Sequence, residues 1–266
     1  MIINVYGVSY FAWVAAAKLA EQGHQVRIYA LATDVSASGF MPEREAGLDG
    51  LIRQQQADGT LQVIREAAAG LPADQHVVGH DSPESGLAER IFPLLQSGAS
   101  ALHLLVLTPM SVGGVARFTR RLKSMAADAG ASWWPHVALL PLFTREGTAL
   151  ADFESPRLFL LGSDDDATTA RVQEVMRPFM SQASQVMTVP VATAELIRFG
   201  INAMLATRMS FMNEMAALAE RLEVDIELVR KGMGADPRVG PDYLSPGCGF
   251  GGPSFASELF DFAQTI

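Results

Sequence analysis

The residues best suited to hold a ligand lie in a glycine-rich loop near the end of the sequence. Residues 244–255 read LSPGCGFGGPSF. Glycine adopts backbone conformations that other residues avoid, so such a loop lets the main chain approach a bound molecule closely. Its main-chain N–H groups can hold a sugar or a phosphate. The substrate-binding residues predicted in this loop are Leu244, Gly249, Phe250, Gly251 and Gly252.

A second candidate site is the turn Gly7-Val8-Ser9-Tyr10. In a G-x-G-x-x-G turn the first glycine makes the bend, the second admits a pyrophosphate and the third lets the helix pack on the strand. These positions are Gly7, Ser9 and Ala12 here, so Ser9 places a side chain where the pyrophosphate is expected. The following helix still offers its N-terminal N–H groups to an anion.

Two other features of a dinucleotide site are altered. The acid expected after the next strand, which binds ribose hydroxyls, is Ala30, and Asp34 is interpreted as a solvated loop carboxylate. No arginine follows the strand to suggest a 2′-phosphate. The single cysteine, Cys248, is interpreted as an inert loop or packing thiol.

Composition limits the class of protein. The chain has 266 residues, of which 49% are hydrophobic and 18% charged, as expected of a folded globule. Its formal charge of −9 argues against a nucleic-acid partner, and one cysteine argues against disulfides and multi-cysteine metal sites. The apolar start lacks a basic leading segment, and other apolar runs are too short for a bilayer. We therefore predict a cytoplasmic protein with no metal and no membrane partner.

The elements that would position these residues alternate along the first part of the chain. Strands are expected at 2–6, 25–29, 76–78, 102–107, 137–140 and 157–161, with helices between most of them, such as 10–22 and 114–129. This alternation predicts an α/β fold, a Rossmann-like, doubly wound and mostly parallel sheet. Residues 1–190 are expected to form this dinucleotide-binding-type domain, and residues 191–266 a helical region that carries the glycine loop.

One long helix is predicted from about Ala192 to Leu222, followed by a shorter one from Asp225 to Met233. Apolar residues recur along the long helix at roughly helical spacing. One interpretation of these residues is core packing. The other adds a dimer seam, because apolar residues on more than one side of a long helix seldom find enough cover in one subunit.

Motifs along the whole chain resemble the UDP-glucose/GDP-mannose dehydrogenase family. The glycine loop resembles its PG-x-GFGG-S-C-F-P-K-D segment, and Gly7-Val8-Ser9-Tyr10 resembles G-x-G-Y. Ser82-Pro83 stands in the place of a Thr-Pro that ends the third strand. Further similar segments, in the family's order, are 19–26, 45–49, 140–149 with 152–153, 193–196, 202, 211–214 and 236–240.

The resemblance implies a function. The family oxidises a sugar-nucleotide's primary alcohol to a carboxylate with two NAD per turnover, and it forms dimers through a central helix. It implies cofactor contacts at Gly7, Ser9, Tyr10, Ser82 and Pro83. It also implies that the family's C-terminal domain, with part of the nucleotide grip, is absent from this sequence.

The family's catalytic positions are mostly replaced. Its nucleophilic cysteine falls on Ser254, and its lysine and aspartate after that cysteine fall on Ser257 and Glu258. A threonine falls on Pro109, and a pair of carboxylates falls on Leu142 and Glu146. The lysine of the central helix falls on Arg198, and its companion asparagine is kept as Asn202. Arg238 matches an arginine that reaches into the neighbouring subunit's substrate site, or else it pairs with Asp236 or Asp242.

The favoured hypothesis is a degenerate dehydrogenase, a pseudoenzyme that binds NAD or a sugar-nucleotide at a weakened site. A second hypothesis is an active two-electron oxidoreductase that uses Arg198, Asn202, Glu146 and Glu258. A third is a non-catalytic dimeric partner of a polysaccharide-precursor enzyme.

Overall fold

The computed structural model describes residues 1–29, 45–65, 70–80, 86–145 and 147–249. The chain divides into two compact units, Met1–Glu195 and Leu196–Ile266, and each is described by itself. The described part contains no helix that is both long and apolar enough to cross a membrane.

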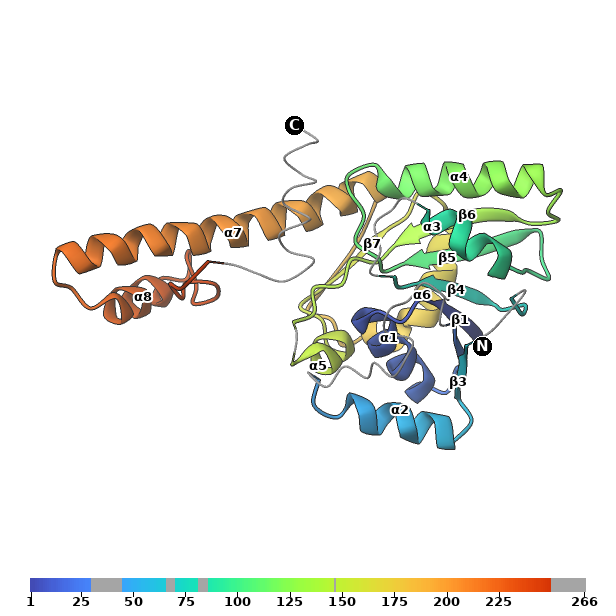
Figure 1. Ribbon diagram of the computed structural model, residues 1–266, viewed down its shortest axis with the longest axis horizontal. Coiled ribbons are helices and arrows are strands. Elements are labelled where there is room, and N and C mark those ends of the chain that lie inside the picture. Colours follow the sequence, from blue (N-terminus) through green and yellow to red (C-terminus); the bar gives the residue numbers. More distant parts are fainter. Residues whose placement is uncertain (30–44, 66–69, 81–85, 146, 250–266) are drawn as a thin grey trace. The chain divides into compact units, whose positions relative to one another are not determined.

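The first unit is built on an eight-stranded sheet with the strand order β3-β2-β1-β4-β5-β6-β7-β8 (Figure 1). All neighbouring strands are parallel except β6 and β7, which pair antiparallel at Leu139 and Gly162 only. This confirms the predicted mostly parallel α/β sheet. The strands are β1 (Ile2–Tyr6), β2 (Gln25–Tyr29), β3 (Leu61–Ile64), β4 (Gln75–Val78), β5 (Ala101–Val106), β6 (Trp134–Leu139), β7 (Leu158–Gly162) and β8 (Gln185–Val189).

Helices cover both faces of the sheet. One buried apolar cluster joins the sheet to α1 (Tyr10–Glu21), α2 (Leu48–Ala57), α5 (Ala149–Glu154) and α6 (Asp166–Met180). The other face carries α4 (Gly114–Asp128), which contacts β6 and the short α3 (Leu87–Ile91), followed by a 3-10 turn (Phe92–Leu94). Buried residues of α4 recur every three or four positions, at Val115, Phe118, Leu122 and Ala126. This spacing gives α4 one apolar stripe facing the sheet.

A buried polar cluster lies between β1 and β4. The Tyr6 hydroxyl is 2.8 Å from Nδ1 of His76, and the two rings stack with a centroid distance of 5.8 Å. The amide of Asn4 donates to the main-chain oxygen of Leu71. Burial lowers the pKa of His76 to about 4, so its imidazole is neutral at pH 7.

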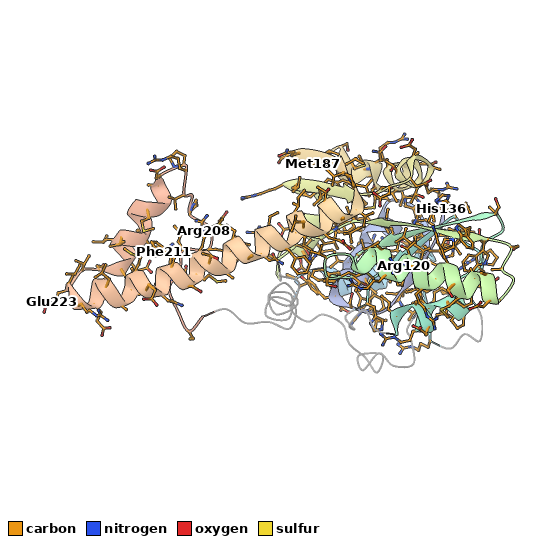
Figure 2. All side chains as sticks on the ribbon, turned by 90° about the horizontal axis from the view of Figure 1, so that it is seen from above. Arg120, His136, Met187, Arg208, Phe211 and Glu223 are labelled. Carbon is orange, nitrogen blue, oxygen red and sulfur yellow. The ribbon has the colours of Figure 1, made fainter. Side chains whose placement is uncertain are left out.

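The two outer strands of the sheet are β3 and β8. The sequence pattern did not predict either of them. β8 is poorly covered, because Gln185, Val186 and Thr188 are exposed and Met187 and Val189 only half-buried. Met187, at the middle of β8, is marked in Figure 2.

The second unit contains most of α7 (Val191–Arg221) and all of α8 (Ile226–Ala235). Asp225 caps α8 by accepting a hydrogen bond from the main-chain N–H of Glu227. The guanidinium of Arg208 donates to the main-chain oxygen of Gly240 at 3.0 Å, which ties the segment after α8 back to α7. The predicted long helix and the shorter one after it are therefore both found, with ends within about two residues of the expected positions.

Candidate functional site

The turn from β1 to α1 has the backbone shape that a dinucleotide site requires. Gly7 has a φ of +102°, which L side chains rarely adopt, and a Cβ there would lie 2.6 Å from the main-chain oxygen of Gly79. The N–H of Gly7 donates to the main-chain oxygen of Tyr29 on β2. Glycine is therefore required at position 7 by conformation and by contact.

Close packing also explains the alanine at the third position of the turn. A Cβ on Gly79, at the end of β4, would lie 2.8 Å from the Cβ of Ala12. The end of β4 and the first turn of α1 therefore touch through Gly79 and Ala12, and a larger residue at either position would force them apart. The carboxyl ends of β1 and β4 meet here, where ligands bind in open α/β sheets.

Ser9 has a specific role in this turn. It is the N-cap of α1, and its hydroxyl oxygen accepts a hydrogen bond from the main-chain N–H of Ala12 at 3.0 Å. Its side chain is 5% exposed. The first N–H groups of a helix have no intrahelical acceptor and are the donors that bind phosphate. Ser9 therefore occupies one donor that an anion at this turn would use.

Tyr10, in the first turn of α1, binds a buried carboxylate. Its hydroxyl donates to Glu45 at 2.5 Å, and the other oxygen of Glu45 accepts from the main-chain N–H of Leu150 in α5 at 3.1 Å. Burial alone would raise the pKa of Glu45, but these hydrogen bonds outweigh it and hold the pKa below its ordinary value. One ionised side chain thus joins the beginnings of α1 and α5.

The ends of β4 and β5 are joined by a buried threonine. The hydroxyl of Thr108 accepts from the main-chain N–H of His80 at 2.8 Å and donates to the main-chain oxygen of Val78. Thr108 is 2% exposed. Pro109 follows it and has no hydroxyl. The hydroxyl of Thr108 is committed to the backbone, so it does not replace the one that Pro109 lacks.

The segment that follows β6 has one apolar position where the resemblance implies a carboxylate. Leu142 is partly buried and packs against the core of the first unit. Further along, Arg145 forms an ion pair with Asp152, which also accepts from the Thr148 hydroxyl. Glu146 lies outside the described residues.

A buried glutamate caps the helix after β5. The carboxylate of Glu195, in the first turn of α7, accepts from the main-chain N–H groups of Gly113 at 2.7 Å and Val115 at 2.9 Å. Glu195 is 1% exposed. The N-terminus of α4 therefore already holds a negative charge supplied by the protein.

In the second unit, α7 carries two of the predicted catalytic residues. Arg198 is buried and Asn202 half-buried. They are four residues apart in one helix, so they lie on the same face. This places a permanent positive charge beside a neutral amide, a pair suited to holding an oxygen or a phosphate.

The predicted substrate residues after α8 are placed as far as Gly249. Arg238 pairs with Asp236 through Nε and Nη2, and its side chain is 87% exposed. Leu244 is buried and lies in contact range of a Cβ at Gly234 in α8. The N–H of Gly247 donates to the side-chain oxygen of Asn213 on α7. Gly249 has a φ of +106°, and Cys248 is exposed.

The structure therefore brings Gly7, Ser9 and Tyr10 together in one turn, and Arg198 and Asn202 together on one helix face. Sequence reasoning missed the roles of Glu45, Thr108 and Glu195, although Glu45 and Glu195 stand in segments that carry the resemblance. The described residues include no cluster of three or more metal-binding side chains. Ser82, Pro83, Phe250, Gly251, Gly252, Ser254 and Glu258 lie outside the described residues, as do Ala30, Asp34 and Ser257.

Comparison with known proteins decides the family. A sequence model of the UDP-glucose/GDP-mannose dehydrogenase family, central domain, matches residues 192–266. A UDP-glucose 6-dehydrogenase of Pseudomonas aeruginosa is 34% identical over 97% of this chain. The chain belongs to the UDP-glucose/GDP-mannose dehydrogenase family. A UDP-glucose 6-dehydrogenase of Bacillus subtilis is 32% identical over 99% of the chain. The chain spans about 60% of the length of these curated relatives.

Solved structures support the fold. A UDP-glucose dehydrogenase from Pyrobaculum islandicum matches 99% of this chain with a TM-score of 0.81 and 24% identity, and the match covers 63% of that protein. A GDP-mannose dehydrogenase from Pseudomonas aeruginosa matches the whole chain with a TM-score of 0.76 and 22% identity, over 64% of that protein. At these identities the likeness establishes the fold shared with dehydrogenases.

Proposed function

We propose that this protein binds a sugar-nucleotide and, at a weakened site, NAD, and that it does not carry out the complete oxidation of a primary alcohol to a carboxylate. The observation that carries the proposal is the N-cap at Ser9. The turn keeps the conformation for close approach of a pyrophosphate, but the Ser9 hydroxyl takes up the N–H of Ala12. A dinucleotide must displace this hydrogen bond or bind with one donor fewer.

The residues at the implied catalytic positions support loss of the full reaction. Trapping an aldehyde as a thiohemiacetal needs a thiolate, and Ser254 is a much weaker nucleophile near neutral pH without an adjacent base. Pro109 has no hydroxyl, and Leu142 packs against the core where a carboxylate is implied. Misplacing or removing groups that move protons costs orders of magnitude in rate.

A second candidate function is a single two-electron oxidation or reduction at a sugar carbon, which needs no thiol. The pair formed by Arg198 and Asn202 favours it, because the two side chains share one face of α7. A charged guanidinium and an amide can stabilise negative charge on a reacting oxygen.

The homodimer expected through α7 belongs to the same proposal. Large apolar side chains at Met204, Phe211 and Leu218 are 61%, 51% and 46% exposed and recur every seven residues. Residues seven apart lie along one side of a helix, as in helices that pair with one another. Figure 2 marks Phe211 on α7. A cytoplasmic location stays a prediction.

Calorimetric titration and a steady-state assay test the function. We expect heat on titration of the purified protein with a UDP- or GDP-sugar, weaker binding of NAD, and no NADH formation above background with a panel of these sugars. NADH formation that Asn202→Ala abolishes would replace the proposal with the second candidate. Absence of heat with NAD and with every sugar-nucleotide would reject it in favour of a non-catalytic partner of a polysaccharide-precursor enzyme.

Sedimentation velocity tests whether the apolar row Met204, Phe211 and Leu218 forms the dimer contact, which we call the α7 seam. Phe211→Glu places a charge in the middle of the seam and should lower the mass of the assembly. Glu220→Gln, on an exposed residue of the same helix outside the apolar series, is the control and should leave it unchanged. Equal masses for wild type and Phe211→Glu would contradict a seam along α7.

A further inference from the structure

The strand β8 presents an unpaired edge to the outside of the sheet. β8 pairs with β7 alone, and it is the last strand in the sheet order. The main-chain N–H of Gln185 donates to the main-chain oxygen of Arg157, just before β7. The main-chain oxygen of Val189 accepts from the main-chain N–H of Ser163, just after β7. In a parallel ladder alternate residues bond to the same neighbour, so the main chains of Val186 and Thr188 point away from β7. Among the described residues, no backbone hydrogen bond joins these two residues to another segment.

This edge lacks the features that usually protect an outer strand. Soluble proteins block such edges with charged residues, prolines or bulges. The sequence of β8 is QVMTV, with neither a charge nor a proline, and its register with β7 is unbroken over five residue pairs. Val186 is 43% exposed. A strand with these properties is a template for another strand.

A groove beside the edge offers further contact area. Its volume is about 550 Å³, and it lies between β8 and α6. Val186 and Met180 supply apolar surface. The α6 helix supplies charges of both signs, Arg177 and Glu174, and Glu174 also pairs with Arg171 of the same helix at 3.3 Å. A surface that carries both signs a turn apart can complement a copy of itself when the two copies run in opposite directions.

We propose that β8 pairs with β8 of a second copy of this chain, antiparallel about a two-fold axis at Met187. The axis brings Met187 opposite Met187 of the partner subunit. Val186 then lies opposite Thr188 of the partner subunit, and these residues exchange main-chain hydrogen bonds, since both point outward. The two α6 helices run antiparallel along the same face, with Glu174 near Arg177 of the partner subunit. The pairing extends the sheet across two subunits and is separate from the seam along α7.

The test uses one substitution in the β8 edge, Met187→Lys, and one in the α7 seam, Phe211→Glu, singly and together. Sedimentation velocity over a dilution series measures the mass of each assembly. Met187→Lys places like charges directly opposite each other across the axis, which destabilises a strand pair. Gln62→Lys adds the same charge to β3, the opposite outer strand, and is the matched control. Wild type should form assemblies larger than a dimer, Met187→Lys and Phe211→Glu should each be dimers, and the double variant should be a monomer. Gln62→Lys should match wild type.

The outcomes separate the two surfaces. If only the α7 seam exists, wild type is a dimer, Met187→Lys remains a dimer and Phe211→Glu is a monomer, which overturns the β8 proposal. If only β8 pairs, Met187→Lys is the monomer and Phe211→Glu the dimer. Hydrogen exchange gives a second readout that does not depend on the α7 seam. The amides of Val186 and Thr188 should be protected in wild type and exchange at least tenfold faster in Met187→Lys, and fast exchange of both in wild type also overturns the proposal.

Discussion

At the scale of single residues, the polar side chains around the β1–α1 turn bind the protein's own main chain. The Ser9 hydroxyl accepts a hydrogen bond from the main-chain N–H of Ala12, and the Glu45 carboxylate accepts one from the main-chain N–H of Leu150. Each interaction satisfies an N–H at a helix beginning that has no intrahelical partner. The turn is thus stable without a ligand, and a ligand's phosphate must compete with an internal acceptor.

Replacing Ser9 by glycine should strengthen NAD binding. Ser9→Gly frees the N–H of Ala12 for a phosphate oxygen, and a hydrogen bond to a charged group is worth about 1.5 kcal/mol or more. The dissociation constant should fall about tenfold. The helix should lose only a few tenths of a kcal/mol, since glycine is itself a fair N-cap. Titration calorimetry measures the change. Unchanged affinity in Ser9→Gly would show that the N-cap does not limit NAD binding.

His76 should make stability depend on pH. Its pKa is about 4 in the folded protein and about 6.5 in an unfolded chain. The folded state therefore binds fewer protons between these values, and stability falls as the pH is lowered from 6.5 to 4. The loss should reach about 3 kcal/mol. Urea unfolding of wild type and His76→Gln at pH 7 and pH 4 isolates this contribution, and parallel curves for the two proteins would refute it.

At the scale of elements, the sequence predicts the interior strands and the long helices best. β1, β2, β5 and α7 carry long apolar or helix-forming runs, so their local pattern identifies them. β3 and β8 are outer strands with polar and exposed residues, which weakens the pattern. The antiparallel contact of β6 with β7 depends on one residue pair, Leu139 and Gly162, and the local sequence pattern does not predict it.

The candidate site is predictable to the same extent. The glycine spacing locates the β1–α1 turn, because that turn is local in sequence. The partners of Glu45 and Glu195 are not predictable in this way, because Glu45 binds Leu150 and Glu195 binds Val115, each far away along the chain. Such contacts depend on the packing of whole elements.

The cap of α4 offers a test at this scale. Glu195→Ala leaves the N–H groups of half-buried Gly113 and buried Val115 without their acceptor, and the loss of a partner for a buried donor costs about 1–3 kcal/mol. We expect the free energy of unfolding to fall by about 3 kcal/mol. Glu195→Gln keeps an acceptor oxygen and should lose less. Denaturant unfolding measures both variants, and equal losses would mean that the carboxylate acts through something other than these two amides.

At the scale of the whole molecule, buried and exposed apolar residues are divided unequally between the two units. The apolar cluster that holds the sheet lies entirely within the first unit. Most of the large exposed apolar side chains lie in the second, including Met204, Phe211, Leu222 and Leu228. A unit with its own core is expected to fold alone, whereas one with an uncovered apolar surface is expected to need a partner.

A fragment of residues 1–195 should therefore fold independently. We expect one cooperative thermal transition by circular dichroism and a dispersed amide spectrum by NMR, because all members of its core are present. The fragment of residues 196–266 is the comparison and should lack a cooperative transition when diluted. A non-cooperative melt of the first fragment would show that its core depends on the second unit.

The carboxylate of Glu45 has a consequence for how the protein responds to acid. The carboxylate accepts hydrogen bonds from the Tyr10 hydroxyl in α1 and from the main-chain N–H of Leu150 in α5. Protonation of this one group would therefore weaken the contacts at the beginnings of both helices. Because the pKa of Glu45 is lowered, its carboxylate takes up a proton only at a pH at which most free carboxyl groups are already uncharged. The connection between α1 and α5 through Glu45 is therefore expected to persist through ordinary fluctuations of pH.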